Sequence, residues 1–267
     1  MCDVQIQRIG VFKFLRDSCA IVHNRTNLLH ENFDRWREKK LDSTCLKRIP
    51  YFIVLVSLVE VALYYLANDT VKRYLLYDPE KNTEIWRFLT YMLIHKDYVH
   101  LFLNLIIQAF LGLPLEAEQG GCRCMTIYFS GGLAGSMGAA IFSPPTLMAG
   151  ASGGIYSLLT SHVANIILNY ETMSYVWYRI TAVTTLMVAD FIHITYHVWL
   201  CNNENPKIEW VAHASGALSG LLIGLLVFSS SSKWRRKIQV TSCLVLIVVV
   251  AIAAAYHLHD VTAPVVG

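Results

Sequence analysis

A serine set between small residues is the first feature of this sequence that points to chemistry. Ser152 lies in Gly150-Ala151-Ser152-Gly153, directly before a long apolar stretch. Glycine lets the backbone adopt conformations that other residues resist and lets a second backbone come close. The first turn of a helix offers unpaired N–H groups that suit a developing oxyanion. The tetrapeptide therefore fits a nucleophile, although small residues also mediate ordinary helix packing in membranes.

A histidine in another apolar stretch could act as the base for this serine. His213 is followed by Gly216 and Gly220, and these spacings place both glycines on the helix face that carries the histidine. Such a stripe lets a neighbouring helix approach closely, and a serine hydroxyl needs an adjacent base to become nucleophilic. Ser152 and His213 therefore predict an acyl-transfer pair. The alternative is a structural histidine bonded to neighbouring backbone.

Donors for an oxyanion are available on a third apolar stretch. His100 and Asn104 are four residues apart, so they share one helix face. Their side-chain N–H groups, with the backbone N–H of Ser152, could stabilise a tetrahedral intermediate, although each could equally make an interhelical hydrogen bond. Asp190 falls in the middle of its apolar stretch, away from the face where the other groups gather. We therefore expect a Ser–His dyad without a third, acidic member.

The elements that must position these groups are membrane spans. Hydrophobic residues make up 55% of the chain and charged residues 15%, whereas soluble domains have about 45–50% and about 25%. Several stretches approach the roughly 20 apolar residues that cross a bilayer. The fold class expected is an all-α, polytopic membrane helix bundle. Pro114 is expected to end the second span. Glu60, in the first span, has no clear partner. The seven spans are expected at 51–67, 98–113, 125–142, 152–168, 180–200, 210–228 and 238–256.

Three regions follow from this division. Residues 1–50 are polar and are expected to form a cytoplasmic N-terminal tail. Residues 51–229 hold the first six helices and every candidate site residue. Residues 230–267 are expected to form a cytoplasmic basic loop, a seventh transmembrane helix and a short luminal tail.

The distribution of basic residues predicts how the spans are oriented. Lysine and arginine are dense at 35–40 and 233–237, and such clusters flank spans on the cytoplasmic side. Six spans lie between the two clusters, so both can be cytoplasmic. Spans two, four and six then begin at the opposite face, which brings His100, Ser152 and His213 to a similar depth. Polar groups within a membrane are costly, so their default interpretation is functional.

Together these residues resemble the rhomboid intramembrane proteases, and the match looks close to their animal secretase-type branch. The similarity covers about residues 51–228, and the extra C-terminal helix is typical of that branch. Ser215 departs from the threonine that is frequent in many relatives after the histidine of the sixth span. The matching elements, in the family's order, are Trp86-Arg87-Phe88, His100 with Asn104, Gly150-Ala151-Ser152-Gly153, and Ala212-His213 with Gly216 and Gly220.

The resemblance implies a serine endopeptidase with a six-helix core. Ser152 would attack the scissile carbonyl, with His213 as general base and then general acid. His100, Asn104 and the Ser152 backbone N–H would hold the oxyanion. No cofactor or metal is implied, and Trp86-Arg87 would shape the first loop.

The resemblance also implies partners and a location. Substrates would be single-pass transmembrane proteins, including growth-factor precursors, cut near the luminal membrane edge. The enzyme would be a multi-pass protein of the secretory pathway (Golgi, endoplasmic reticulum or plasma membrane), with a cytoplasmic N-terminus and the lipid bilayer as its surroundings. No nucleic-acid partner is expected, because no basic patch is interleaved with stacking aromatic residues.

Two other functions remain open at this point. Asp190, His193 and His197 share one face of the fifth span and could bind a metal or relay protons in a transporter. An inactive rhomboid-like binding protein would retain substrates without cutting them. Such relatives typically lack the serine or the histidine, and this chain has both.

Overall fold

The expected spans are helices. A computed structural model of the chain describes residues 49–81, 83–143, 145–173, 176–196, 206–230 and 232–262, and their side chains except at 193–194, 206–209 and 256–262. The expected N-terminal tail lies almost entirely outside the described residues. The long helices are α2 (Tyr51–Leu66), α5 (Tyr98–Gln119), α6 (Gly121–Phe142), α7 (Ser152–Asn169), α8 (Val176–Thr195), α9 (Pro206–Val227) and α10 (Arg235–Thr262).

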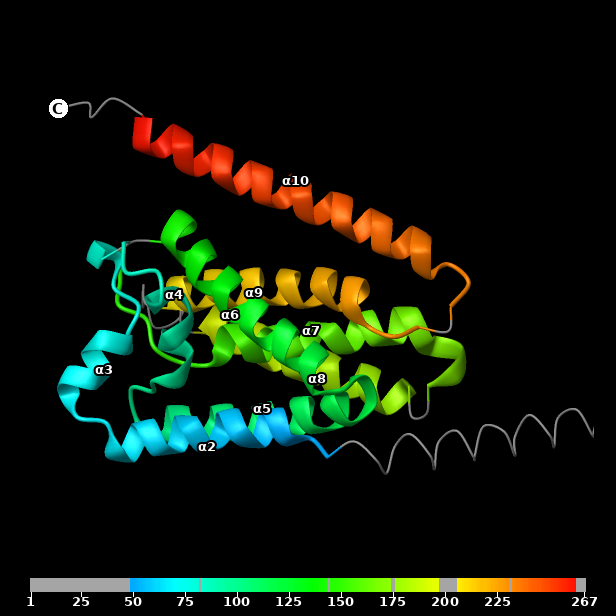
Figure 1. Ribbon diagram of the computed structural model, residues 1–267, viewed down its shortest axis with the longest axis horizontal. Helices are drawn as coiled ribbons and strands as arrows, with labels where there is room; N and C mark the ends of the chain where they lie inside the picture. Colours follow the sequence, from blue (N-terminus) through cyan, green and yellow to red (C-terminus); the bar gives the residue numbers. More distant parts are fainter. Residues whose placement is uncertain are drawn as a thin grey trace, which may run out of the picture. The chain divides into compact units, whose positions relative to one another are not determined.

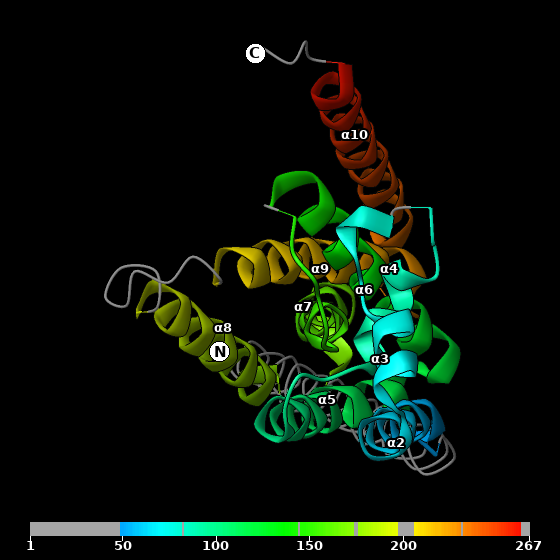
Figure 2. The ribbon, with the colours of Figure 1, turned by 90° about the vertical axis from the view of Figure 1, so that its left-hand side faces the viewer.

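This arrangement confirms the all-α polytopic bundle. Within the described part of the chain, four helical segments are long and apolar enough to cross a membrane: 98–119, 121–142, 210–227 and 235–255. Figure 2 views α7 nearly end-on, with α5, α6, α8 and α9 around it. The last helix, α10, lies outside this group and packs mainly against α9 (Figure 1). Its apolar surface is almost entirely exposed, as suits a helix that faces lipid.

The prediction that Pro114 ends the second span is wrong, because α5 continues through it to Gln119. The turn after the proline is held from outside the helix. Glu116 is 1% exposed, and its carboxylate accepts the backbone N–H groups of Phe52 at 2.8 Å and Ile53 at 2.9 Å. These donors lie in the first turn of α2, where N–H groups lack partners within the helix. The carboxylate therefore ties the end of α5 to the start of α2.

Glu60, for which the sequence offered no partner, is fully buried between three helices. The Tyr128 hydroxyl of α6 donates to one carboxylate oxygen at 2.8 Å, and Gln108 Nε2 of α5 donates to the other at 3.2 Å. Buried polar groups are stable when they are hydrogen-bonded in this way. Glu60 is thus part of a polar contact that joins α2, α5 and α6.

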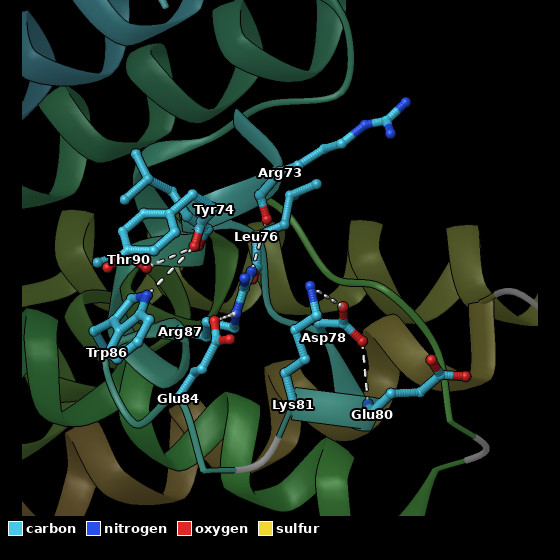
Figure 3. Close-up of polar contacts among 11 residues, drawn as sticks. Arg73, Tyr74, Leu76, Asp78, Glu80, Lys81, Glu84, Trp86, Arg87 and Thr90 are labelled. Carbon is cyan, nitrogen blue, oxygen red and sulfur yellow. Dashed lines mark hydrogen bonds and ion pairs between the residues drawn. The ribbon is translucent and has the colours of Figure 1, made fainter. Parts of the chain in front are cut away.

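The loop between α2 and α5 is folded around one arginine (Figure 3). Arg87 is 2% exposed. Its Nε donates to Glu84 at 2.6 Å, and its Nη1 donates to the carbonyls of Arg73 and Leu76, each at 2.7 Å. The Trp86 ring stacks on a neighbouring aromatic side chain of the same loop. The loop contains the short helices α3 (Asp69–Leu75), η1 (Pro79–Lys81), α4 (Arg87–Thr90) and η2 (Tyr91–Leu93).

Candidate active site

The segment before Ser152 is held by the folded first loop. Tyr77 and Met148 exchange two backbone hydrogen bonds, of 3.2 and 3.1 Å. Two residues further on, the Gly150 N–H donates to the Tyr91 carbonyl at 3.0 Å. Ser152 is the first residue of α7. The loop that Arg87 organises therefore fixes the point at which this helix begins.

Gly150 brings His100 close to the same segment. Its φ of 126° lies in a region that side chains rarely adopt. A Cβ atom built on Gly150 would lie 2.5 Å from His100 Cε1 and 2.8 Å from His100 Nε2. The His100 imidazole thus occupies the space that a side chain at position 150 would need. Asp97 caps the helix that carries it, because its carboxylate accepts the His100 backbone N–H at 2.9 Å.

Asn104 presents a buried donor one turn further along α5. The residue is 7% exposed, and its Nδ2 has no hydrogen-bond partner among the described residues. An unsatisfied buried donor is costly, of the order of 1–3 kcal/mol. An oxygen atom of a bound molecule beside Asn104 Nδ2 would satisfy this donor.

His213 reaches α7 through a face-to-face ring contact. Its imidazole stacks on Tyr156, with ring centroids 4.1 Å apart and planes inclined by 11°. Tyr156 follows Ser152 by four residues, so the two side chains share one face of α7. Tyr156 was not predicted as a site residue, although its spacing of four residues from Ser152 was the signal that could have identified it. The contact brings His213 to the face of α7 that carries Ser152.

The glycines singled out in the sequence set how closely α7 and α9 approach. A Cβ on Gly216 would collide with the carbonyl of Gly153, and a Cβ on Gly220 would collide with the backbone of Ser157. A hydrogen bond from Thr160 Oγ1 to the Ala217 carbonyl, of 2.6 Å, continues the contact. The two backbones are thus in direct contact beside Ser152 and His213.

The expectation that no acidic residue lies near His213 is wrong. Asp190 Oδ2 is 3.7 Å from His213 Nδ1, and the two side chains are 22% and 13% exposed. The error concerned how far along its helix, and so at what membrane depth, Asp190 lies. Asp190 lies five residues before the end of α8 at Thr195, and His213 lies seven residues after the start of α9 at Pro206. At 1.5 Å per residue, these offsets are roughly 8 and 10 Å, so the two residues lie at comparable depth.

The metal or proton-transport alternative requires Asp190, His193 and His197 to act together. Asp190 is directed toward His213. The His193 side chain and all of His197 lie outside what the structure describes. Among the described side chains, no group of three or more histidine, cysteine, aspartate or glutamate residues could hold a metal ion.

His95 is a further buried residue near the site that was not predicted from the sequence. It is 4% exposed, its ring lies 5.2 Å from that of His100, and neither ring nitrogen has a partner among the described residues. Burial, with a smaller contribution from the charge of His100, lowers its pKa from 6.5 to about 4, although Asp97 opposes this. The imidazole is therefore neutral at physiological pH. Its position five residues before His100 was the one available signal.

Comparisons with known proteins identify the family of this chain. The Rhomboid domain family model matches residues 82–230. The chain is 32% identical to Rhomboid-related protein 2 of Mus musculus over 230 residues, which are 78% of this chain and 76% of the relative. It is 28% identical to Rhomboid-related protein 3 of Homo sapiens over 240 residues, covering 80% of this chain and 59% of the relative.

A third relative carries a different description. The chain is 27% identical over 198 residues to Inactive rhomboid-related protein 2 of Caenorhabditis elegans, covering 70% of this chain and 56% of the relative. It thus spans about three quarters of the length of the mouse relative and less than two thirds of the human and nematode relatives. The family model and the mouse relative together show that this chain belongs to the rhomboid family.

Proposed function

We propose that this rhomboid protein is an intramembrane serine endopeptidase that cuts single-pass transmembrane proteins near their luminal membrane edge. One observation carries the proposal: the His213 ring stacks at 4.1 Å on Tyr156, one turn from Ser152. The direct contact between the backbones at Gly153 and Gly216 supports it, because it brings the two helices as close as they can come. An imidazole held near a serine hydroxyl in this way can act as the base that makes the serine nucleophilic.

The reaction would proceed in two halves. Ser152 Oγ attacks the scissile carbonyl carbon while His213 takes the hydroxyl proton. His213 then gives that proton to the leaving amine as the C–N bond breaks, which leaves an acyl-enzyme. In the second half, His213 takes a proton from water as the water oxygen attacks the acyl carbon. The proton returns to Ser152 Oγ as the ester bond breaks.

The oxyanion of each tetrahedral intermediate needs donors. Asn104 Nδ2 is buried without a partner in the described part of the chain, so it can donate without breaking an existing bond. His100, which lies against Gly150, and the backbone N–H of Ser152 at the start of α7 would complete the set. Donors fixed before the reaction need no reorganisation in the transition state, and losing one typically costs ~10²–10³ in rate.

The substrate must present an extended segment. A peptide bond within a transmembrane helix is hydrogen-bonded internally and shielded from attack. Substrates that unwind easily at their luminal membrane edge, growth-factor precursors among them, would therefore be cut preferentially. Inserting glycine or proline there should increase cleavage. In this proposal the N-terminus is cytoplasmic, and the site opens to the lumen of the secretory pathway or to the cell exterior.

A second function is favoured by one comparison. In this second function the chain retains single-pass proteins without cutting them, and the similarity to a nematode relative named as inactive favours it. Both functions predict binding to such proteins. Only the enzyme predicts product that depends on Ser152 and His213.

Co-expression with a tagged single-pass substrate separates the two. Cleavage should occur with the native chain and be lost in Ser152→Ala and His213→Ala, with membrane insertion unchanged. Ser161→Ala is a matched control, because Ser161 lies on the same helix and its hydroxyl donates locally to the Leu158 carbonyl at 2.7 Å. Cleavage that persists in Ser152→Ala would overturn this nucleophile. Co-purification of an intact substrate with the native chain, without product, would favour the binding protein.

A further inference from the structure

We infer that Asp190 is a positioning residue that orients the His213 imidazole and selects its tautomer. This inference rests on the proposed protease function. It begins from the ion-pair distance of 3.7 Å between Asp190 Oδ2 and His213 Nδ1.

The placement of Asp190 on α8 differs from that of its neighbours. Val188, Phe191 and Ile192 are 49%, 67% and 60% exposed, as suits residues that face lipid. The Asp190 side chain is only 22% exposed. It continues the inward stripe of Val183, which is buried seven residues earlier on the same face. A carboxylate in a membrane span is costly, and such residues face the bundle interior and pair with polar groups.

The chemistry of the two groups fixes which tautomer this contact favours. An ionised carboxylate only accepts hydrogen bonds, so it favours a proton on the nitrogen that faces it. His213 Nδ1 is buried and has no hydrogen-bond partner among the described residues. The Asp190 carboxylate, 3.7 Å away, is within ion-pair distance of it. With the proton on Nδ1, the lone pair lies on Nε2. That nitrogen is then free to take the proton of Ser152.

The same contact would stabilise the ring after proton transfer. The positively charged imidazolium formed during attack lies beside the carboxylate, and opposite charges at this separation attract strongly in a water-poor site. The distance of 3.7 Å is longer than a hydrogen bond, but such bonds are often long before substrate binds and shorten in the complex. Tyr156 holds the face of the ring at 4.1 Å, and Asp190 acts on its edge. Two contacts from two helices would therefore define the ring's position.

The alternative is that Asp190 serves only to pack α8 against α9. The two roles predict opposite orders among variants. Asparagine has nearly the shape of aspartate without its charge, whereas glutamate keeps the carboxylate but is longer. A positioning role predicts that Asp190→Glu retains more activity than Asp190→Asn. A packing role predicts the reverse.

The experiment uses the purified full chain in detergent with a fluorescently tagged single-pass substrate. In Asp190→Asn, kcat should fall at least about 10- to 100-fold, the range typical when a group that orients a metal-binding imidazole is replaced, while KM changes less than about twofold. A fluorophosphonate probe should label Ser152 more slowly in parallel. That reaction forms a P–O bond and releases fluoride, while His213 takes the serine proton. Glu171→Gln, an exposed carboxylate beyond the other end of α7, is the matched control.

A tautomer measurement covers the case in which a variant folds poorly. The ¹⁵N spectrum of histidine-labelled protein, with the His213 signals assigned from His213→Ala, should show less Nδ1–H tautomer in Asp190→Asn. An unchanged tautomer, a kcat within twofold of native, or a higher kcat in Asp190→Asn than in Asp190→Glu would overturn the inference. Ser152→Ala is measured alongside. If it still cleaves, the proposed function fails; if it is inactive while Asp190→Asn is fully active, only the role of Asp190 fails.

Discussion

The ring of His213 lies parallel to the ring of Tyr156, 4.1 Å away, so the imidazole is held by the helix that carries Ser152. A stacked aromatic ring restricts how the histidine can rotate without using either ring nitrogen. Stacking of this kind is worth about 0.5–1.5 kcal/mol beyond burial. The contact thus leaves both nitrogens available for proton transfer and for Asp190.

Removing the stack should weaken catalysis more than it weakens the fold. Tyr156→Phe keeps the aromatic face, and we expect its kcat to stay within about threefold of native. Tyr156→Ala removes the face, and we expect at least a tenfold loss of kcat, because a misplaced reacting group costs rate steeply. Cleavage of a tagged substrate by equal amounts of folded protein measures both. Equal loss in the two variants would show that the hydroxyl, and not the stack, matters.

The approach of α9 to α7 gives a second prediction. Gly216→Ala would force a methyl group into the Gly153 carbonyl, so the helices must separate beside the site. Gly224→Ala is the matched control on the same helix. The nearest atoms to its new methyl are side-chain carbons of Ala164 and Ser161, at 2.9 and 3.3 Å.

We expect Gly216→Ala to lose activity at least 100-fold and to unfold at lower temperature, since overpacking costs about 1–3 kcal/mol. Gly224→Ala should keep most activity, because it lies two turns further from the site. Activity and thermal unfolding in detergent test both variants. The interpretation is wrong if Gly224→Ala is the more damaging of the two for cleavage.

Asn104 should show opposite effects on activity and stability. Its buried Nδ2 makes no hydrogen bond with the described residues, so replacing it with leucine removes an unsatisfied donor. We expect Asn104→Leu to be at least as stable as native, because apolar replacement of an unpaired polar group is neutral or stabilising. Activity should fall ~10²–10³-fold through the lost oxyanion donor. Thermal unfolding and kcat, measured on the same preparation, test this; a clearly destabilised Asn104→Leu would mean that Asn104 has a structural partner.

The sequence was sufficient to predict the helices and the helix faces that meet. Small residues at regular spacing around Gly153 and Gly216 encode close approach, and the structure brings these two glycines together. The start of the fourth span at Ser152 was likewise predicted from the local sequence, and α7 begins at that residue. Residue patterns within single helices were therefore enough to predict the start of α7 and its close approach to α9.

What the sequence could not provide is relative depth and partners from distant segments. Asp190 was placed wrongly because an apolar stretch does not show where its helix begins and ends. Pro114 was taken as a helix end because the bond from Glu116 to the start of α2 joins residues more than sixty positions apart. Glu60 had no visible partner for the same reason, since Gln108 and Tyr128 lie on other helices. Long-range contacts of this kind leave no local pattern.

The buried His95 predicts how stability changes with pH. Its folded pKa of about 4 lies below the ordinary value of 6.5, mainly because burial disfavours the charged ring. Between these two values the unfolded chain binds a proton that the folded chain does not, so acid favours unfolding. This contribution to stability is complete above about pH 6.5 and is lost as the pH falls toward 4. A shift of this size corresponds to about 3 kcal/mol at most.

The prediction is tested by comparing native protein with His95→Gln, which cannot titrate. Other groups also affect unfolding in acid, so the informative quantity is the difference in slope between the two proteins. The melting temperature of the native chain should fall more steeply between pH 6.5 and 4 than that of His95→Gln, and the two slopes should agree above pH 7. Parallel curves over the whole range would mean that His95 titrates equally in the folded and unfolded chains. Its contact with His100 would then have to be looser than the 4% exposure of His95 indicates.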